Sequence, residues 1–286
     1  MAATDKPNRA PPESLIHRGV GRVEFFDMTD EELKNMRQLL KALAEEGRHL
    51  FSFHAPISRP AWFWHSGVAC FFMNEDTKAR ELSFRLLAET LQYARSWQAQ
   101  HVVTHLTYGP ADCKDEATAR KLAAAAGARM AAMSKASGIP IDIEFAAYTD
   151  SFHKADNFAE MIDEHPELGI CLDVGHVFIG AQKRERDYWK DIETLAPRTR
   201  SMHLWNTRGA DDVKANGHLP LHPSQSPKDG WIDIEGTLRA VLSASPEASI
   251  VFEYPVDRIT PAIQKGYDWV SQFVQKTKQI IQGEKE

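Results

Sequence analysis

"GICLDVGHVF", residues 169–178, places an acid and an imidazole at the end of an apolar, β-branched stretch bounded by Gly169 and Gly180. The stretch predicts a buried strand, with Asp173 and His176 three residues apart near its carboxyl end. Burying an unpaired carboxylate costs several kcal/mol. A strand of this kind therefore indicates a partner for Asp173, and the rest of the chain shows what the partner could be.

Strand-like and helical patterns alternate along the whole chain. Short apolar runs predict strands at 22–26, 49–57, 101–106, 139–145, 169–176, 201–205 and 249–255. Helical patterns lie between them, near 28–47, 76–97, 115–137, 155–165, 185–196, 233–244 and 260–281. Repeated strand–helix units imply a parallel sheet, and seven strands come close to the eight of a closed (β/α) barrel. An open doubly wound sheet is the alternative, less favoured because no Gly-rich phosphate loop follows a strand.

Composition narrows the class of protein. The chain has 286 residues, 43% hydrophobic, with a net charge of -6 and scattered Lys and Arg, which argues against a nucleic-acid partner. Residues 1–12 are Pro-rich and predict a flexible arm, followed by a single catalytic domain at 13–286. Three widely spaced cysteines and the lack of a ~20-residue apolar run favour a cytoplasmic protein without a membrane span.

Six successive strands carry an imidazole or a carboxylate near their carboxyl ends. These residues are His54, His105, Glu144, Asp173 with His176, His203 and Glu253. In a parallel barrel such ends converge on one mouth, where barrel enzymes place their chemistry. Carboxylate and imidazole together suit a divalent ion, here Mn²⁺, Zn²⁺, Co²⁺, Fe²⁺ or Mg²⁺. A metal would also neutralise the buried acids, and it would thus be the partner that a buried Asp173 requires.

The motifs "HAP", "IEF", "LDVGH", "HLWN", "GHLPL" and "FEYP", in this order, resemble the xylose isomerase-like TIM-barrel superfamily. The resemblance runs from about residue 14 to 281. The superfamily has a branch of sugar isomerases and epimerases and a branch of enzymes like endonuclease IV. It implies that His176 contacts substrate and that Glu144 and Glu253 act as general base and acid. It also implies four metal ligands, which are Glu144, Asp173, His203 and Glu253.

The resemblance extends to further residues. His54, His105 and His218 match additional ligands of the three-metal endonuclease branch, and in an epimerase they would line the substrate site. The endonuclease pattern has an aspartate where this chain has Asn216. Because an amide is a poorer ligand for a hard cation than a carboxylate, this difference argues against a complete three-metal site. Arg208, on the loop after His203, is a looser match to a substrate contact. Three tryptophans could wall the substrate or simply pack beneath their loops: Trp62, Trp64 and Trp205.

We therefore expect a metal-dependent isomerase or epimerase acting on a sugar, keto-sugar or polyol-type substrate. Two alternatives stay open, a multi-metal phosphodiester hydrolase like endonuclease IV, and a metal-dependent lyase, dehydratase or oxidative enzyme on the same fold. The family's first strand has no counterpart here. Its absence leaves three outcomes: a barrel lacking one strand, a gap, or closure by the arm or by a partner subunit in a homo-oligomer.

Overall fold

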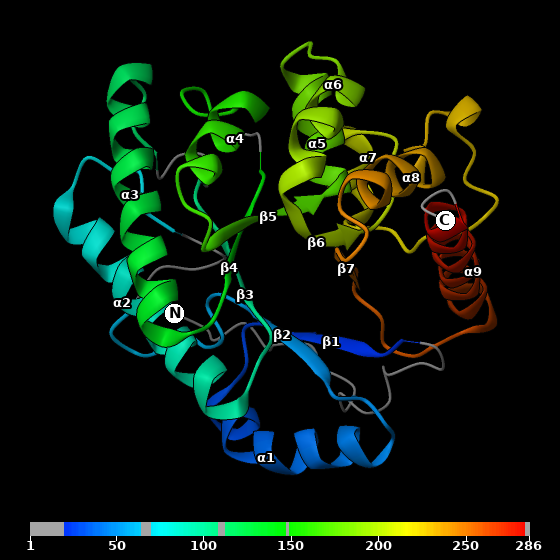
Figure 1. Ribbon diagram of the computed structural model, residues 1–286, viewed down its shortest axis with the longest axis horizontal. Helices are drawn as coiled ribbons and strands as arrows, with labels where there is room; N and C mark the ends of the chain where they lie inside the picture. The colour runs from blue at the N-terminus through cyan, green and yellow to red at the C-terminus, as the bar shows by residue number, and fades with distance from the viewer. Residues whose placement is uncertain (1–19, 64–69, 108–111, 147–148, 284–286) are drawn as a thin grey trace.

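A computed structural model describes residues 20–63, 70–107, 112–146 and 149–283. Seven strands form one sheet in the order β1-β2-β3-β4-β5-β6-β7, and every neighbouring pair is parallel. Helices surround this sheet on its outer side (Figure 1). The strands are β1 (Arg22–Phe25), β2 (Leu50–His54), β3 (Val102–His105), β4 (Ile141–Glu144), β5 (Leu168–Asp173), β6 (Thr199–Leu204) and β7 (Ser249–Phe252). The predicted (β/α) barrel is confirmed.

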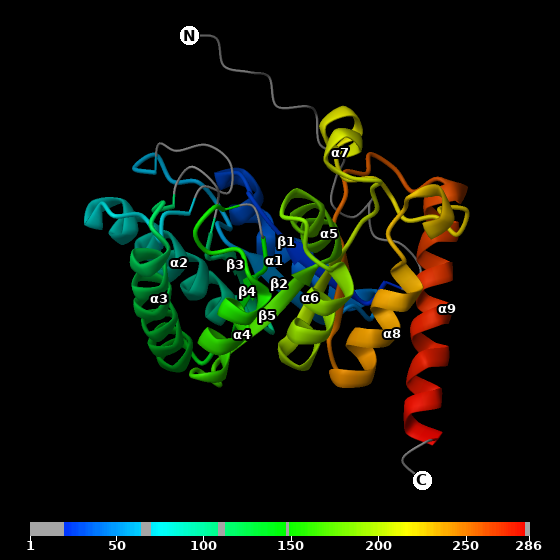
Figure 2. The same ribbon diagram turned by 90° about the horizontal axis from the view of Figure 1, so that it is seen from above.

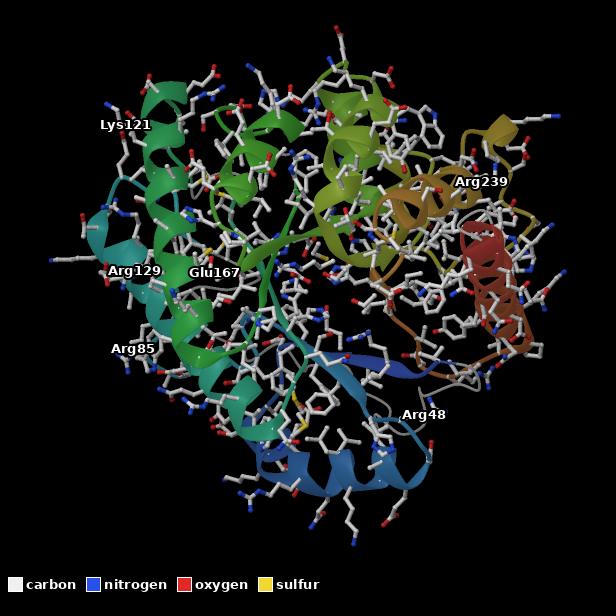
Figure 3. All side chains as sticks on the ribbon, viewed as in Figure 1. Arg48, Arg85, Lys121, Arg129, Glu167 and Arg239 are labelled. Atoms are coloured by element: carbon white, nitrogen blue, oxygen red, sulfur yellow. The ribbon has the colours of Figure 1, made fainter. Side chains whose placement is uncertain are left out.

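The helices follow the strands in the expected alternation, and α8 and α9 lie side by side near the end of the chain (Figure 2). Charged side chains such as Arg85, Lys121 and Arg239 project outward from the helices (Figure 3). The helices are α1 (Asp30–Glu45), α2 (Thr77–Trp97), α3 (Glu116–Ser137), α4 (Ala155–Asp163), α5 (Val174–Lys183), α6 (Tyr188–Leu195), α7 (Ala210–Asn216), α8 (Ile234–Ala244) and α9 (Pro261–Gly283), with 3₁₀ turns η3 (Ala196–Arg198) and η4 (Pro227–Asp229).

Local sequence explains most helix starts. Thr29 and Glu32 form a capping box at the start of α1, with the Glu32 amide donating to Thr29 Oγ1 and the Thr29 amide donating to Glu32. Asp76 and Asp115 are the N-caps of α2 and α3, and the side chain of each accepts a hydrogen bond from a backbone amide in the first turn. These caps fix where each helix leaves the barrel mouth, and apolar residues of strands and helices then pack into one core between them.

The sheet is open at one seam. Within the described parts of the chain, β1 and β7 are the edge strands, and no backbone ladder joins them. As far as the described residues go, the barrel therefore lacks one strand, which is one of the outcomes expected from the sequence. The predicted arm at 1–12 lies outside the described residues. None of the described helices is long and apolar enough to cross a membrane.

Two helices, α5 and α7, were not predicted. The strand expected from Gly169 onward ends at Asp173, and α5 begins directly at Val174. The helix expected at 185–196 is present as α6. The segment was read as strand because β-branched residues and glycines lower helix propensity. Tertiary context overrides that preference, since the Asp173 side chain caps α5 by accepting from the His176 amide at 2.6 Å. The loop expected after β6 likewise contains the short helix α7.

Candidate active site

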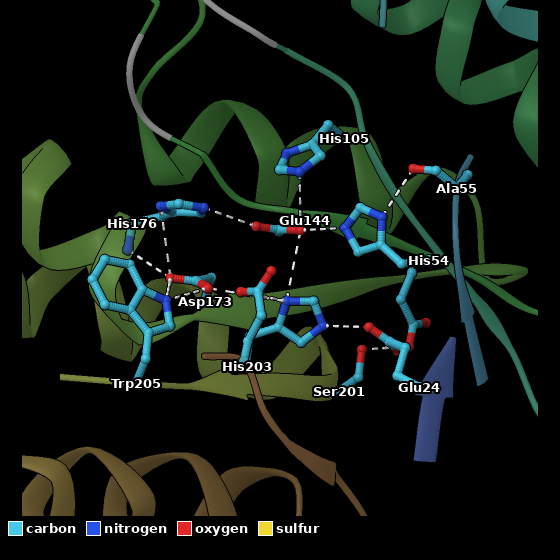
Figure 4. Close-up of polar contacts among 12 residues, drawn as sticks. Glu24, His54, Ala55, His105, Glu144, Asp173, His176, Ser201, His203 and Trp205 are labelled. Carbon is cyan, nitrogen blue, oxygen red and sulfur yellow. Dashed lines mark hydrogen bonds and ion pairs between the residues drawn. The ribbon is translucent and has the colours of Figure 1, made fainter. Parts of the chain in front are cut away.

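Four side chains from four neighbouring strands meet at the barrel mouth. Figure 4 shows three of them, Glu144, Asp173 and His203. Glu144 ends β4, Asp173 ends β5, His203 lies near the end of β6, and Glu253 follows β7 directly. Each offers one ligand atom, and these atoms lie within 4.8 Å of one another. The predicted ligand positions are therefore adjacent in space, because parallel strands deliver their carboxyl ends to the same rim.

The donor set fits a divalent cation. His203 Nδ1 lies 3.3 Å from Glu253 Oε2, yet within the described residues neither atom makes a hydrogen bond. Buried polar atoms are normally hydrogen-bonded, so such a pair points to a ligand between them. Three carboxylates and one imidazole are ligands suited to Mn²⁺, Zn²⁺ and related ions. Glu144, Asp173, His203 and Glu253 would hold it.

Asp173 is held in place by two neighbours. Its Oδ1 accepts from the His176 amide, and the Trp205 indole N–H points at both carboxylate oxygens, 2.9 Å from Oδ1 and 2.7 Å from Oδ2. Burial raises the pKa of Asp173 to about 6; the charge of His176 opposes this rise, whereas Glu253 and Glu144 reinforce it. A cation at this point would replace the proton and relieve the repulsion among the carboxylates.

Glu144 is surrounded by imidazoles. Its Oε2 lies 2.9 Å from His54 Nε2 and 3.3 Å from His105 Nε2, and its Oε1 lies 3.2 Å from His176 Nε2. Burial tends to raise the pKa of Glu144, but the neighbouring histidines outweigh it and hold the pKa well below its usual range. Glu144 is therefore an ionised carboxylate, able to bind a cation or accept a proton.

The histidines around Glu144 differ in their charge. Burial lowers the pKa of His105 to about 4, although the charge of Glu144 opposes this shift. Burial also acts to lower the pKa of His176, but Asp173 and Glu144 overcome it and raise that pKa to about 9. His105 is thus neutral near pH 7, whereas His176 carries a positive charge beside the four candidate ligands.

Trp205 and His218 form a stacked pair next to the ligands. Their ring centroids are 3.7 Å apart with an interplanar angle of 5°, and His218 Nδ1 lies 3.1 Å from the carbonyl oxygen of Glu253. Trp205 is fully buried on the far side of the His218 ring from solvent, and its indole N–H is directed at Asp173. This position favours the packing role over direct substrate contact for Trp205. His218 is half-buried and stays a candidate substrate contact.

The remaining candidates lie farther from the ligands or in undescribed parts. Arg208 pairs with Asp212 at 3.4 Å and lies over the Trp231 ring at 5.1 Å, with a largely exposed side chain. The Trp62 ring receives the Arg85 guanidinium of α2 at 3.9 Å, which favours packing against that helix. Asn216 donates to Asp212 on α7. Trp64 lies outside the described residues.

Sequence reasoning missed Glu24. The side chain of this β1 residue is 7% exposed, and its Oε1 makes a 2.8 Å hydrogen bond with Nε2 of His203, a residue 179 positions away in the chain. Burial tends to raise the pKa of Glu24, but His203 and other imidazoles lower it to about 2. The available signal was a carboxylate in the middle of the apolar strand "RVEFF", which by strand alternation faces the same side as Arg22 and Phe26.

The family model described as "Xylose isomerase-like TIM barrel" matches residues 15–273. The chain belongs to this family. Among solved structures, a D-tagatose 3-epimerase-like protein superposes with a TM-score of 0.69 at 15% identity, covering 92% of each chain. L-ribulose 3-epimerase gives a TM-score of 0.67 at 14% identity, covering 92% of this chain and 87% of its own.

A third similar structure is a xylose isomerase-like TIM barrel protein from Mycobacterium smegmatis in complex with magnesium. It has a TM-score of 0.61 at 15% identity and covers 91% of this chain and 85% of its own. A search of curated protein sequences finds no match. At these identities the likeness establishes the shared fold, so the chemistry must be argued from the side chains themselves.

Proposed function

We propose that this family member is a metal-dependent isomerase or epimerase acting on a sugar, keto-sugar or polyol-type substrate. The observation that supports it most is the group Glu144, Asp173, His203 and Glu253, whose ligand atoms lie within 4.8 Å of one another. The likeness to a D-tagatose 3-epimerase-like protein, to L-ribulose 3-epimerase and to a magnesium-bound barrel agrees with this assignment. The metal is a divalent ion, Mn²⁺, Zn²⁺, Co²⁺, Fe²⁺ or Mg²⁺.

The side chains suit proton transfer beside a carbonyl group. When bound, a divalent ion supplies Lewis acidity, which lowers the barrier for removing a proton next to a carbonyl. Glu144 and Glu253 reach the site from β4 and from the residue after β7, so they flank a substrate held between them. One carboxylate takes the proton and the other returns it, as general base and acid.

The surrounding histidines suit substrate binding. His176 carries positive charge, and it lies 3.2 Å from Glu144, close enough to donate to a substrate oxygen beside that carboxylate. His54 and His105 each place their Nε2 against the other carboxylate oxygen of Glu144. His218 and Arg208 lie on the segment after β6, where a bound sugar would extend. A small hydroxylated carbonyl compound matches this polar lining.

Deuterium exchange tests the proposed proton transfer. We expect the Mn²⁺-loaded protein, incubated with ketohexoses and ketopentoses in D₂O, to incorporate deuterium beside the carbonyl and to form the epimer. Glu144→Gln should abolish both and weaken metal binding, because the amide is a poor base and a poorer ligand. Glu193→Gln, on the exposed face of α6, is the matched control and should keep wild-type turnover. Full activity in Glu144→Gln would refute the assignment.

A multi-metal phosphodiester hydrolase is the second candidate, because one geometric feature favours it. His54, Glu144 and His203 also place ligand atoms within 4.8 Å of one another, so a second ion could share Glu144 and His203. Metal analysis and an abasic-DNA cleavage assay separate the two functions. Two or three zinc ions per chain with DNA cleavage would support hydrolysis, and one ion with ketose turnover supports the epimerase.

The cysteines, the net charge and the open seam bear on the location and the partners of the protein. Cys70, Cys113 and Cys171 are all free and buried, which agrees with a reducing, cytoplasmic location. The acidic net charge of -6 argues against a nucleic-acid partner. The open seam between β1 and β7 is compatible with closure by a second copy of the chain, so a homo-oligomer stays a prediction.

A further inference from the structure

Glu24 makes the contact that fixes how His203 faces the site. Glu24 Oε1 lies 2.8 Å from His203 Nε2, on the side of the ring away from the other carboxylates (Figure 4). The opposite ring nitrogen, Nδ1, lies 3.3 Å from Glu253 Oε2, 3.7 Å from Glu144 Oε2 and 4.0 Å from Asp173 Oδ2. The imidazole is therefore held between one carboxylate behind it and three in front.

This arrangement selects one tautomer of the imidazole. A neutral histidine carries its proton on one ring nitrogen only, and an ionised carboxylate can accept a hydrogen bond but cannot donate one. Glu24 therefore keeps the proton of His203 on Nε2 and leaves the lone pair of Nδ1 directed at the ligand group. The other tautomer would put a proton where the metal must bind.

Glu24 is itself held in position. Ser52 Oγ, on the adjacent strand β2, donates to Glu24 Oε2 at 2.7 Å, and Glu24 and Ser52 are direct partners in the strand register. The two carboxylate oxygens thus have separate tasks, one fixed by Ser52 and one facing His203. Its partner His203 is fully buried, so water does not compete for this contact.

We propose that Glu24 is a positioning residue, which, anchored by Ser52, holds His203 in the Nε2-protonated tautomer and in the orientation required of a metal ligand. The inference rests on the proposed metal centre. A carboxylate behind a metal-binding imidazole also raises its basicity, and loss of such a partner typically weakens metal binding about 10- to 100-fold. The site thus includes a fifth strand, β1, although β1 supplies no ligand.

Glu24→Gln tests the proposal with little change in shape. The amide can turn either its oxygen or its NH₂ group toward Nε2, so it no longer enforces one tautomer. We expect titration calorimetry to show Mn²⁺ binding weakened about 10- to 100-fold. Burial acts to lower the pKa of His203, but neighbouring acidic groups raise it well above its ordinary value, so the metal-free protein is examined at a pH high enough to leave this ring neutral. There, the ¹⁵N signals of the His203 ring, assigned with His203→Gln, should move from the Nε2–H pattern toward a mixture.

Asp142→Asn is the matched control. Asp142 is also a buried carboxylate on the inner face of the sheet, but it bonds to Ser201 and makes no described contact with His203. Metal affinity in this variant should stay within about 2-fold of wild type. An equal loss in both variants would show a general effect of removing buried charge and would overturn the proposal.

Ser52→Ala covers the case in which Glu24→Gln fails to fold. It leaves Glu24 in the chain but removes its anchor, so we expect a smaller loss of affinity and a broader distribution of His203 tautomers. Unchanged affinity and unchanged ring signals in the folded variants would overturn the role of Glu24. Wild-type protein that binds no Mn²⁺ would overturn the proposed function, while the tautomer signals of the metal-free proteins would still decide the role of Glu24.

Discussion

At the scale of single residues, the site depends on carboxylates whose partners hold them in different states. Glu144 is ionised among three imidazoles, whereas Asp173 has a pKa raised to about 6 by burial. The identity of these residues followed from the sequence, because each lies at a strand end. Their partners could not be predicted in the same way, since the contacts of Glu24 and Trp205 join positions far apart in the chain.

His105 should make the metal-free protein less stable in mild acid. Its pKa is about 4 when folded, because of burial, against an ordinary value of 6.5, so the unfolded chain binds the extra proton between these values. Stability should therefore fall as pH drops from 6.5 to 4, by up to about 3 kcal/mol from this group. Urea unfolding at pH 7 and pH 5 in EDTA measures the loss.

His105→Asn isolates this contribution. The variant lacks the imidazole, so its stability difference between pH 7 and pH 5 should be smaller than that of wild type. Gln38→Asn, at an exposed position of α1 without a titratable side chain, controls for the mutation itself. Equal pH dependence in His105→Asn and wild type would show that the imidazole does not stay neutral when buried.

At the scale of elements, the junction between β5 and α5 places two candidate site residues within a single turn. Asp173 ends the strand and caps the helix, and His176 follows one turn later. The sequence predicted the strand and both residues but not the helix, because the cap depends on where the chain turns. Gly175 matters here because a Cβ atom at this position would lie 2.1 Å from Trp205 Cζ2.

Gly175→Ala should therefore damage the site through packing. The added methyl group would displace the Trp205 indole, which donates to Asp173, and overpacking of this kind costs about 1–3 kcal/mol. We expect a lower melting temperature together with weaker Mn²⁺ binding, measured by calorimetry. Gly138→Ala is an unsuitable control because of its positive φ, but Gly21→Ala meets open space and should change neither quantity. Wild-type metal affinity in Gly175→Ala would show that Asp173 does not depend on this contact.

At the scale of the whole molecule, the candidate ligands lie on one half of an open barrel. β4 to β7 carry all four ligands, while β1 reaches the site only through Glu24. The barrel architecture was predictable because repeated strand–helix units leave few parallel arrangements. The seam was predicted only as one of three outcomes, since a sequence does not show what replaces a missing strand.

A metal that binds four strands of an open sheet should stabilise the entire fold. Binding to the folded state alone contributes RT ln(1 + [L]/Kd), about 2.7 kcal/mol at a concentration of 100 Kd. For a chain of 286 residues, with an unfolding entropy of about 2.1 cal/mol/K per residue, this corresponds to a rise in melting temperature of roughly 4–5 °C. Scanning calorimetry with EDTA and with Mn²⁺ measures the shift. Glu253→Gln should reduce it strongly, because Glu253 joins the last strand to the group, whereas Glu193→Gln should retain it. An equal shift in all three proteins would place the bound metal elsewhere in the molecule.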